Sequence, residues 1–594
     1  MKQISNLSAD TQVKQMGYPS TDRPWLKYYS DEAITAPLPK CTLYQYIWEN
    51  NKDHLQDTAV NYYGTRITYG EFFARVKKVA SAFHNLGVRK GDVVTIMSMH
   101  TPETLISVYA LNYIGAVANM VYMTLSEKEI PAYLRNTDSK LFLVLDIALD
   151  RVNLVNKDIP CPVIVLGIAD SMPGNLKFVY GLKNRKKKHD FISWKTILQS
   201  EIMELPMSTD HEQTAVIVYT SGTTGEPKGV LLSSDNLNSE AHQLRQTDRN
   251  YQRKQTVLMI LPPFIIFGTS MSHLALSTGT ELIICIQLDN DAIGKMFNRY
   301  KPNRYVAGPM YLDGIIEHVK GDLSNVIDIT GGGDSITSEK EEEFNCFLAY
   351  HGSSVRYMTG YGMSEVSAAV TINMDRAYKK GSLGVPLVHT IAKITDTDTG
   401  EELSYGEIGE ICFSTPGIMQ GYYKNEQATG ECIELDGTGR RWLHTGDLGL
   451  IDQDGFLFFK GRIKRIYMIL GTDGFAYKLF PQRIEEYLES KENVESCGVV
   501  VCEDKEKLHK AYAFVVLNTD LQRKDELIGE LRTEVMKDLP EHLRPESISI
   551  IESMPTTPSG KKDYRKLEKY LTKASTGESL CDRQTDRQTD RIAA

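Results

Sequence analysis

The chain alternates short apolar segments with longer segments of helical periodicity, and this alternation strongly limits the folds open to it. Between residues 57 and 145 the apolar runs "AVNYYG", "VVTIMSM" and "KLFLVLD" are separated by the helix-like segments "TYGEFFARVKKVASAFHNLG" and "TLISVYALNYIG". Buried strands that alternate with helices are typical of a parallel sheet with crossover helices. The pattern resumes through "VLMILPP", "TELIICIQ" and "RYVAGP". We therefore expect an α/β fold whose large N-terminal domain has mixed or parallel sheets and crossover helices.

The strand–helix alternation ends near Gly381. Short strands and turns such as "GEIGEICFS" and "GDLGLIDQDGFLFF" predict a β-rich subdomain. After "KGRIKR", a run of helix, strand, strand and helix is long enough for a small α+β domain. We expect an N-terminal domain over residues 1–463 and a C-terminal domain over residues 464–575. The repeat "DRQTDRQTDR" has no apolar residue, so residues 576–594 are expected to be a disordered tail.

Composition excludes several classes of protein. A chain of 594 residues is too long for one hydrophobic core, which supports at least two domains. The net charge of -10 disfavours a nucleic-acid partner held by phosphate contacts. The nine cysteines form no C-x-x-C pair and the thirteen histidines no H-E-x-x-H motif. We therefore expect reduced thiols and no dedicated zinc site.

One uncharged run, from Thr104 to Ser126, raises the question of a membrane span. It contains asparagines and tyrosines and is divided by Gly115, so it is interpreted as a buried helix followed by a buried strand. The N-terminus lacks the apolar core of a signal peptide. We expect a cytoplasmic protein without an integral membrane segment.

The stretch "YTSGTTGEPKGV", at residues 219–230, concentrates hydroxyl side chains, glycines and one lysine. It does not match the P-loop of kinases and ATPases, because Lys228 is followed by glycine and Pro227 stands where the helix would begin. Glycines allow close approach of the backbone, while hydroxyls and lysine suit phosphate. The strand-like "AVIVYT" before it predicts a loop at the carboxyl edge of a sheet, where ligands bind; the alternative is a flexible surface loop. The predicted phosphate contacts are Thr220, Ser221, Gly222, Thr223, Thr224, Gly225 and Lys228.

Six segments resemble, in the same order, the motifs of the adenylate-forming (AMP-binding) superfamily, which includes acyl-CoA synthetases, adenylation domains of peptide synthetases and luciferases. The stretch "YTSGTTGEPKGV" resembles its phosphate loop, and "GYGMSE" resembles its aromatic-Gly-x-Thr/Ser-Glu motif. The other four segments are "GEIGEICFSTPGIMQGYY", "WLHTGDLG", "GRIKR" and "PTTPSGKKDYRKL". The match covers residues from about 40 to 570, and the chain resembles acyl-CoA synthetases and fatty-acid–CoA ligases within the superfamily.

The resemblance implies ATP-dependent activation of a carboxylic acid. The carboxylate attacks the α-phosphate of MgATP to give an acyl-adenylate and pyrophosphate, and in acyl-CoA synthetases the thiol of coenzyme A then displaces AMP. A carboxylate is already ionised at neutral pH, so this step needs cations and aligned donors rather than a general base. The implied cofactors are ATP and Mg²⁺, with coenzyme A as co-substrate, and the implied partners are small molecules.

Three residues carry the implied catalytic roles. Lys561 is expected to bridge the carboxylate and the α-phosphate in the first step. Glu365 is expected to bind Mg²⁺ through one hard oxygen. Lys464 occupies the hinge position, about which the small mobile C-terminal domain is expected to rotate between adenylation and thioester formation.

The nucleotide contacts follow from the same motifs. The segment "GGGD" resembles the lining of the adenine pocket, with Asp334 as a polar contact, and the ring of Tyr361 is expected to stack on adenine. Asp447 is expected to accept both ribose hydroxyls, because an ionised carboxylate is only an acceptor, and Arg462 is expected to contact ribose and phosphate. The full predicted set is Gly332, Gly333, Asp334, Tyr361, Gly362, Ser364, Asp447 and Arg462.

The chain departs from the superfamily pattern in three places. Ile265 replaces a histidine that is common near the acyl pocket, and Ser233 and Ser234 replace a Thr-His pair. The segment 471–483 is longer than usual and has Arg483 where glutamate is common. That segment usually lies near the thiol channel, so the acceptor is less well defined than the adenylation step.

The acyl substrate is read from the segment "PPFIIFGTSMSHLALSTG", which is apolar and has no carboxylate to hold an α-amino group. This favours a fatty acid or another apolar acid, although a buried helix has the same composition. Two alternatives stay open: transfer to a carrier-protein thiol or another acceptor, and a non-catalytic nucleotide or carboxylate sensor. The absence of a visible carrier domain favours free coenzyme A, and the joint presence of Glu365, Asp447, Arg462 and Lys561 disfavours a sensor.

Overall fold

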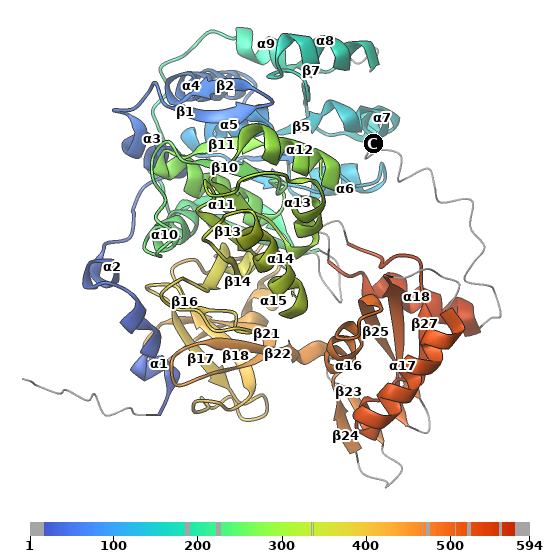
Figure 1. Cartoon of the computed structure of the whole chain (residues 1–594). Coiled ribbons are helices and arrows are strands. Elements are labelled where there is room, and N and C mark those ends of the chain that lie inside the picture. The colour runs from blue at the N-terminus through green and yellow to red at the C-terminus, as the bar shows by residue number, and fades with distance from the viewer. Residues whose placement is uncertain are drawn as a thin grey trace, which may run out of the picture.

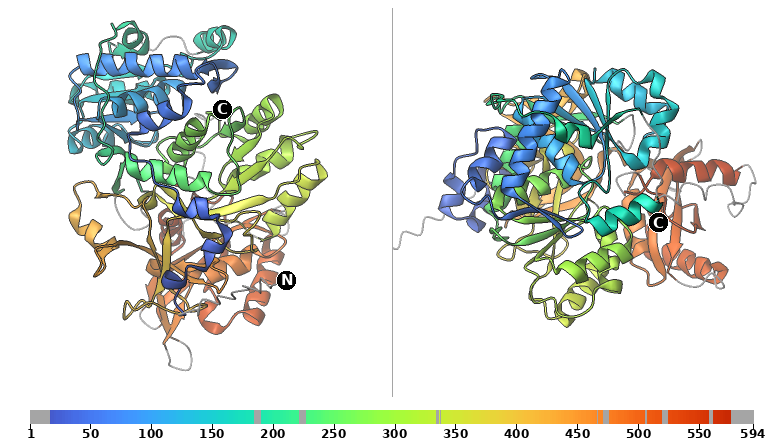
Figure 2. Two further views of the ribbon diagram at one scale, coloured as in Figure 1. Left: turned by 90° about the vertical axis from the view of Figure 1, so that its left-hand side faces the viewer. Right: turned by 90° about the horizontal axis from the view of Figure 1, so that it is seen from above.

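The computed structural model describes residues 17–183, 190–220, 227–333, 336, 338–465, 467–470, 476–504, 507–518, 524–557 and 561–575. A large N-terminal body contains stacked sheets and helices, and a smaller C-terminal unit lies beside it (Figure 1). The view from above in Figure 2 also places the C-terminal unit to one side. The predicted α/β class, with a large N-terminal part and a small α+β C-terminal part, is confirmed. The tail 576–594 lies outside the described residues.

One sheet of the N-terminal body has eight strands in the order β19-β9-β8-β4-β3-β5-β6-β7. Strands β3 to β8 run parallel to their neighbours, as the alternation predicts, while β9 and β19 are antiparallel. The strands are β3 (Val93–Met97), β4 (Val117–Met120), β5 (Leu141–Leu145), β6 (Val163–Leu166), β7 (Ile192–Ser193), β8 (Thr214–Tyr219), β9 (Gly229–Ser233) and β19 (Gly421–Tyr422). Strand β9 begins directly after Lys228 and pairs with β8, where a P-loop would lead into a helix, which agrees with the rejection of a P-loop.

The uncharged run forms helix α5 (Pro102–Tyr113) and strand β4, as predicted. Every residue from Pro102 to Asn112 is buried, because α5 packs against α4 (Tyr69–Asn85) and β4. Helix α4 begins with a capping box in which Thr68 and Glu71 satisfy each other's backbone N–H groups. No described helix is long and apolar enough to cross a membrane.

A second sheet has nine strands in the order β16-β15-β14-β13-β12-β10-β11-β1-β2. The run "AVNYYG" forms β1, which pairs in parallel with β11 of this sheet and not with β3. The sequence does not show which of the two sheets this strand joins, because strands of equal apolar character can be sorted only by long-range pairing. The strands are β1 (Thr58–Tyr62), β2 (Thr65–Thr68), β10 (Thr256–Met259), β11 (Glu281–Ile284), β12 (Arg304–Val306), β13 (Asp328–Gly331), β14 (Tyr357–Met363), β15 (Ala368–Ile372) and β16 (Val385–Pro386).

The predicted β-rich subdomain is an antiparallel five-stranded sheet. Its strands are β17 (Ile391–Thr395), β18 (Gly409–Ser414), β20 (Ile433–Leu435), β21 (Arg441–Ile451) and β22 (Leu457–Arg462). The helices of the N-terminal body not yet named are α1 (Pro19–Asp22), α2 (Asp31–Thr35), α3 (Leu43–Asn51), α6 (Glu129–Asn136), α7 (Leu149–Leu154), α8 (Gly174–Lys183), α9 (Trp194–Gln199), α10 (Ser234–Arg245), α11 (Ile266–Thr278), α12 (Asn290–Tyr300), α13 (Leu312–His318), α14 (Ser338–Tyr350) and α15 (Glu426–Cys432).

The C-terminal unit has its own buried apolar clusters. It contains the predicted order of helix, strand, strand and helix in α16 (Pro481–Glu489), β25 (Val494–Asp504), β26 (Leu508–Leu517) and α17 (Lys524–Asp538). The hairpin of β23 (Tyr467–Leu470) and β24 (Ala476–Leu479), strand β27 (Ser547–Ile550) and helix α18 (Tyr564–Ser575) were not predicted. The three strands span only four residues each, which is too short for a clear periodicity.

Candidate active site

Three predicted nucleotide contacts come together from separate strands. The Tyr361 hydroxyl on β14 donates to Asp447 Oδ2 at 2.6 Å. Arg462 Nε lies 3.2 Å from Asp447 Oδ1, and the pairing of β21 with β22 places these two residues opposite each other. Tyr361 is therefore tied to the strand that carries the predicted ribose contact.

Asp447 keeps one oxygen available in a buried place. Its side chain is 0% exposed, and within the described part of the chain no donor is aligned for a hydrogen bond to Oδ1, despite the nearby Arg462. Burial raises the pKa of Asp447, while Arg462, the Tyr361 hydroxyl and Lys561 lower it. A buried acceptor without a donor fits a ribose hydroxyl.

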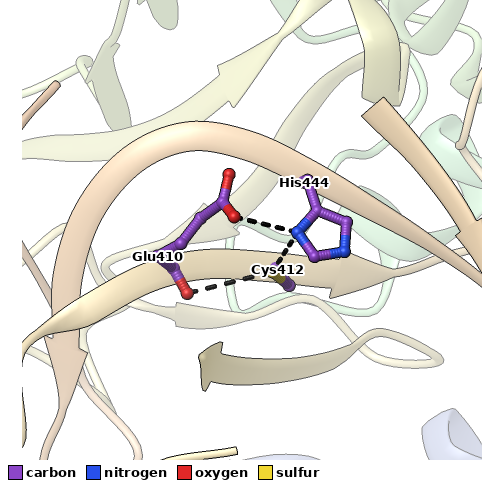
Figure 3. Close-up of side chains that lie close together, drawn as sticks. All are labelled: Glu410, Cys412 and His444. Atoms are coloured by element: carbon purple, nitrogen blue, oxygen red, sulfur yellow. Dashed lines mark hydrogen bonds and ion pairs between the residues drawn. The ribbon is translucent and has the colours of Figure 1, made fainter. Parts of the chain in front are cut away.

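Sequence reasoning missed a polar cluster of Glu410, Cys412 and His444, which Figure 3 shows. His444 Nδ1 lies 2.9 Å from Glu410 Oε2 and 3.3 Å from Cys412 Sγ. The other oxygen of Glu410 accepts the Gly446 N–H at 2.9 Å, immediately before Asp447. The ligand atoms of the three side chains lie within 4.8 Å of one another, as in a metal site, but hydrogen bonds account for all of them. The register of β18 with β21, which pairs Cys412 with His444, brings the cluster together.

Glu365, the predicted magnesium ligand, lies in the short turn that follows β14. Its Oε1 accepts a hydrogen bond from the Tyr422 hydroxyl at 2.7 Å, and its backbone carbonyl accepts from Met419 N–H at 2.8 Å. No ion pair of the described residues includes Glu365. A carboxylate that is held by a neutral phenol and not by a cation fits the hard-oxygen chemistry of Mg²⁺.

The phosphate-loop stretch is described only at its two ends. Thr220 N–H donates to the Lys228 carbonyl at 3.0 Å, and Lys228 N–H lies 3.4 Å from Thr220 Oγ1, so the two ends of the loop are joined. The Lys228 ammonium lies 4.7 Å from the centre of the Tyr422 ring. The following predicted contacts lie outside the described residues: Ser221, Gly222, Thr223, Thr224 and Gly225.

The predicted adenine segment leaves β13 beside β14. A Cβ atom on Gly331 would lie 1.6 Å from the Tyr357 hydroxyl oxygen, so only glycine fits there. Gly332 follows, and an added Cβ would approach the Gly360 carbonyl to 3.3 Å, whereas Gly333 has a positive φ of 91°. Asp334 lies outside the described residues. The segment is thus glycine-rich because it passes close to the neighbouring strand.

Gly362 and Ser364 lie on either side of the end of β14. A Cβ on Gly362 would lie 1.5 Å from the Ala368 carbonyl of β15, so Gly362 serves close strand packing. Ser364 begins the turn that holds Glu365, and its carbonyl accepts the Ser367 N–H at 3.2 Å. The structure supports a positioning role for both residues.

The apolar segment "PPFIIFGTSMSHLALSTG" forms helix α11, and a buried carboxyl group from helix α10 is hydrogen-bonded to it. Glu240 of α10 is 0% exposed, accepts the Ala369 N–H of β15 at 2.8 Å and is hydrogen-bonded to the Ser270 hydroxyl of α11. Burial raises the pKa of Glu240 well above its ordinary value, which favours the neutral acid. Sequence reasoning missed this residue, because Glu240 and Ser270 are distant in the chain.

The positions that depart from the superfamily pattern lie at the start of α10, at the start of α11 and in α16. Ser233 caps α10, and Ser234 Oγ lies 3.1 Å from Asn112 Nδ2. Ile265 precedes the first residue of α11 with an extended backbone. Arg483 lies in α16, and residues 471–475 lie outside the described part.

The predicted hinge segment lies directly before the C-terminal unit, and Lys561 lies just before its last helix, α18. Lys464 is exposed in a short 3₁₀ turn, whereas the next residue, Arg465, pairs with Glu485 of α16 at 2.8 Å. Lys561 is exposed, and its N–H donates to Thr557 Oγ1 at 3.2 Å. Lys562 instead pairs with Glu489 at 2.6 Å. The first of the two lysines thus faces outward while the second anchors the turn.

Family models match two regions of the chain. The model described as AMP-binding enzyme matches residues 47–423, and the model described as AMP-binding enzyme C-terminal domain matches residues 483–561. The chain belongs to the AMP-binding enzyme family. The predicted superfamily is confirmed.

Curated relatives match nearly the whole chain. A long-chain-fatty-acid–CoA ligase of Bacillus subtilis (strain 168) is 27% identical over 566 residues, which cover 92% of this chain and 98% of the relative. A 4-coumarate–CoA ligase 1 of Arabidopsis thaliana is 27% identical over 562 residues, covering 90% and 95% of the two chains. The predicted enzyme class, an AMP-forming acid–thiol ligase, is the class that these names describe.

Solved structures share the fold. ATP-bound MatB from Rhodopseudomonas palustris matches with a TM-score of 0.76 and 20% identity, over 89% of this chain and 99% of that chain. The anthranilate CoA ligase AuaEII in complex with anthranoyl-AMP matches with a TM-score of 0.76 and 20% identity, over 91% and 99%. At this identity the likeness concerns the fold alone.

Proposed function

We propose that this chain is an acyl-CoA synthetase that activates an apolar carboxylic acid with MgATP and transfers the acyl group to coenzyme A. The observation that carries the proposal is the meeting of Tyr361, Asp447 and Arg462, which come from three separate strands. These are the residues expected to contact adenine, ribose and phosphate, so their contact with one another supports a nucleotide site.

The residues have distinct roles in the proposed reaction. Asp447 accepts the ribose hydroxyls and Tyr361 supports the adenine. Glu365 holds Mg²⁺, which supplies charge neutralisation on the phosphates when it is bound. Lys561 brings the acid and the α-phosphate together, where a fixed cation stabilises the charge that develops on phosphorus. Lys228 contacts the β- and γ-phosphates, which leave as pyrophosphate.

The substrate is an apolar acid because the groups around α11 favour neutral ligands. Glu240, the carboxyl group found beside Ser270, is favoured as the neutral acid and is already hydrogen-bonded at both oxygens. It is therefore a poor partner for an α-ammonium group. The names of the relatives include both a long-chain fatty acid and 4-coumarate, so aliphatic and aromatic acids both belong in the test.

The proposal and its alternatives differ in the molecule that accepts the acyl group. Coenzyme A is proposed because the relatives are named CoA ligases. A structural neighbour of the same fold is described as an amide bond synthetase, so an amine is a second candidate acceptor alongside a carrier-protein thiol.

The test measures pyrophosphate and AMP with aliphatic, aromatic and amino acids, each with and without coenzyme A. We expect pyrophosphate with an apolar acid and a thioester only when coenzyme A is present. Pyrophosphate that forms without any thioester would point to another acceptor. Formation of ADP, or no pyrophosphate with any acid, would contradict the proposed function.

A further inference from the structure

Given the proposed function, we infer that Tyr422 is a positioning residue that couples the phosphate-loop lysine, Lys228, to the magnesium carboxylate, Glu365. Both groups act on the same triphosphate from different segments of the chain. The Tyr422 side chain contacts both.

The two ends of the Tyr422 side chain have different partners. Its hydroxyl donates to Glu365 Oε1 at 2.7 Å. The face of its ring lies 4.7 Å from the Lys228 ammonium, within the range of a cation–π interaction.

The backbone fixes Tyr422 between the two partners. Strand β19 pairs antiparallel with β9, which directly follows Lys228, and Tyr423 N–H donates to the Gly229 carbonyl at 2.7 Å. On the other side, Met419 N–H donates to the Glu365 carbonyl at 2.8 Å. The segment 419–423 is therefore bonded both to the exit of the phosphate loop and to the magnesium-binding turn.

This arrangement gives the hydroxyl and the ring separate tasks. The hydroxyl occupies one oxygen of Glu365 and so fixes the direction in which the carboxylate offers its electrons to Mg²⁺. The ring holds the Lys228 ammonium beside the site, which reduces the side-chain entropy lost when the lysine contacts phosphate. Removal of the hydroxyl should therefore change the Mg²⁺ dependence, and removal of the ring should change the KM for MgATP.

The experiment compares Tyr422→Phe, Tyr422→Leu and the matched control Tyr423→Phe in the full chain. Tyr423 is the adjacent tyrosine, but its ring lies near Lys424 rather than Lys228. Pyrophosphate release is measured against Mg²⁺, MgATP and acid, and thioester formation is measured separately from supplied acyl-adenylate and coenzyme A. Thermal unfolding confirms that each variant is folded.

For Tyr422→Phe we expect the Mg²⁺ concentration at half-maximal adenylation to rise about tenfold, because a hydrogen bond to a charged group is lost. The KM for the acid and the rate of thioester formation should not change. Tyr422→Leu should add about a threefold rise in the KM for MgATP through loss of the cation–π contact. Tyr423→Phe should match the unmodified chain.

The coupling is overturned if Tyr422→Phe leaves the Mg²⁺ dependence unchanged, slows both half-reactions equally, or behaves like Tyr423→Phe. If the unmodified chain releases no pyrophosphate, the proposed function fails instead. In that case calorimetry can still measure how the binding of ATP depends on Mg²⁺, in the unmodified chain and in Tyr422→Phe. Equal Mg²⁺ dependence in that assay would also reject the coupling.

Discussion

At the scale of single residues, His444 is held as a cation. Its hydrogen bonds with Cys412 and Glu410 raise its pKa from 6.5 to about 11. Since the folded-state pKa lies above the unfolded value, the stability gained is fully present below about pH 6.5 and is lost as the pH rises towards 11. The His444 side chain thus pairs with the Glu410 carboxylate, whose other oxygen accepts a hydrogen bond from the Gly446 N–H.

We predict that His444→Gln lowers the free energy of unfolding on the order of 1 kcal/mol near neutral pH, because the pair is partly exposed. The difference from the unmodified chain should shrink steadily as the pH rises towards about 10. Urea unfolding at a series of pH values measures it. A difference that is constant with pH would show that His444 does not carry the charge.

Asp447 offers a second test at this scale. Asp447→Asn keeps the shape but replaces one acceptor oxygen by a donor, so one ribose hydroxyl loses its acceptor. We expect the KM for ATP to rise about tenfold or more while the KM for the acid stays constant, with exposed Asp398→Asn as control. Equal changes in both constants would argue against a ribose contact.

At the scale of secondary-structure elements, Glu240 joins α10, α11 and β15. Its carboxyl group satisfies the Ala369 N–H and is hydrogen-bonded to the Ser270 hydroxyl in a fully buried place. We predict that Glu240→Ala destabilises the chain by about 2–4 kcal/mol, because two buried polar groups lose their partner. Glu240→Gln, which retains an acceptor and has similar volume, should cost less than half of that in urea unfolding. An equal loss in both variants would contradict this prediction, because the glutamine variant keeps both the volume and an acceptor.

The elements also show how far the sequence alone leads. Apolar alternation predicts β3, β4, β5 and their parallel order, because each strand and its crossover helix are local. The motifs locate Tyr361, Asp447 and Arg462, which the structure brings together. The same reasoning does not find the sheet of β1, the partners of Glu240 or the Tyr422–Glu365 contact, since these depend on strand register and on packing between segments far apart in the chain.

At the scale of the whole molecule, the residue that follows the predicted hinge, Arg465, is held by contacts within the C-terminal unit. Arg465 pairs with Glu485, and its guanidinium lies 3.9 Å from the centre of the Tyr564 ring, close to the turn of Lys561. Arg465 therefore belongs to the body that carries Lys561, while Arg462 pairs with Asp447 in the other body. The exposed Lys464 lies between the two attachments, and we propose that its backbone absorbs the rotation.

This division predicts opposite effects on the two half-reactions. Lys561→Ala should lower pyrophosphate formation by about 100-fold or more, because the cation at the α-phosphate is lost, yet spare thioester formation from supplied acyl-adenylate. Lys464→Pro should spare pyrophosphate formation and block the thioester step, since proline fixes φ and limits rotation. The control is Lys566→Ala, an exposed lysine of α18. If Lys561→Ala impairs both half-reactions equally, or Lys464→Pro turns over thioester at the full rate, rotation about this hinge does not separate the two steps.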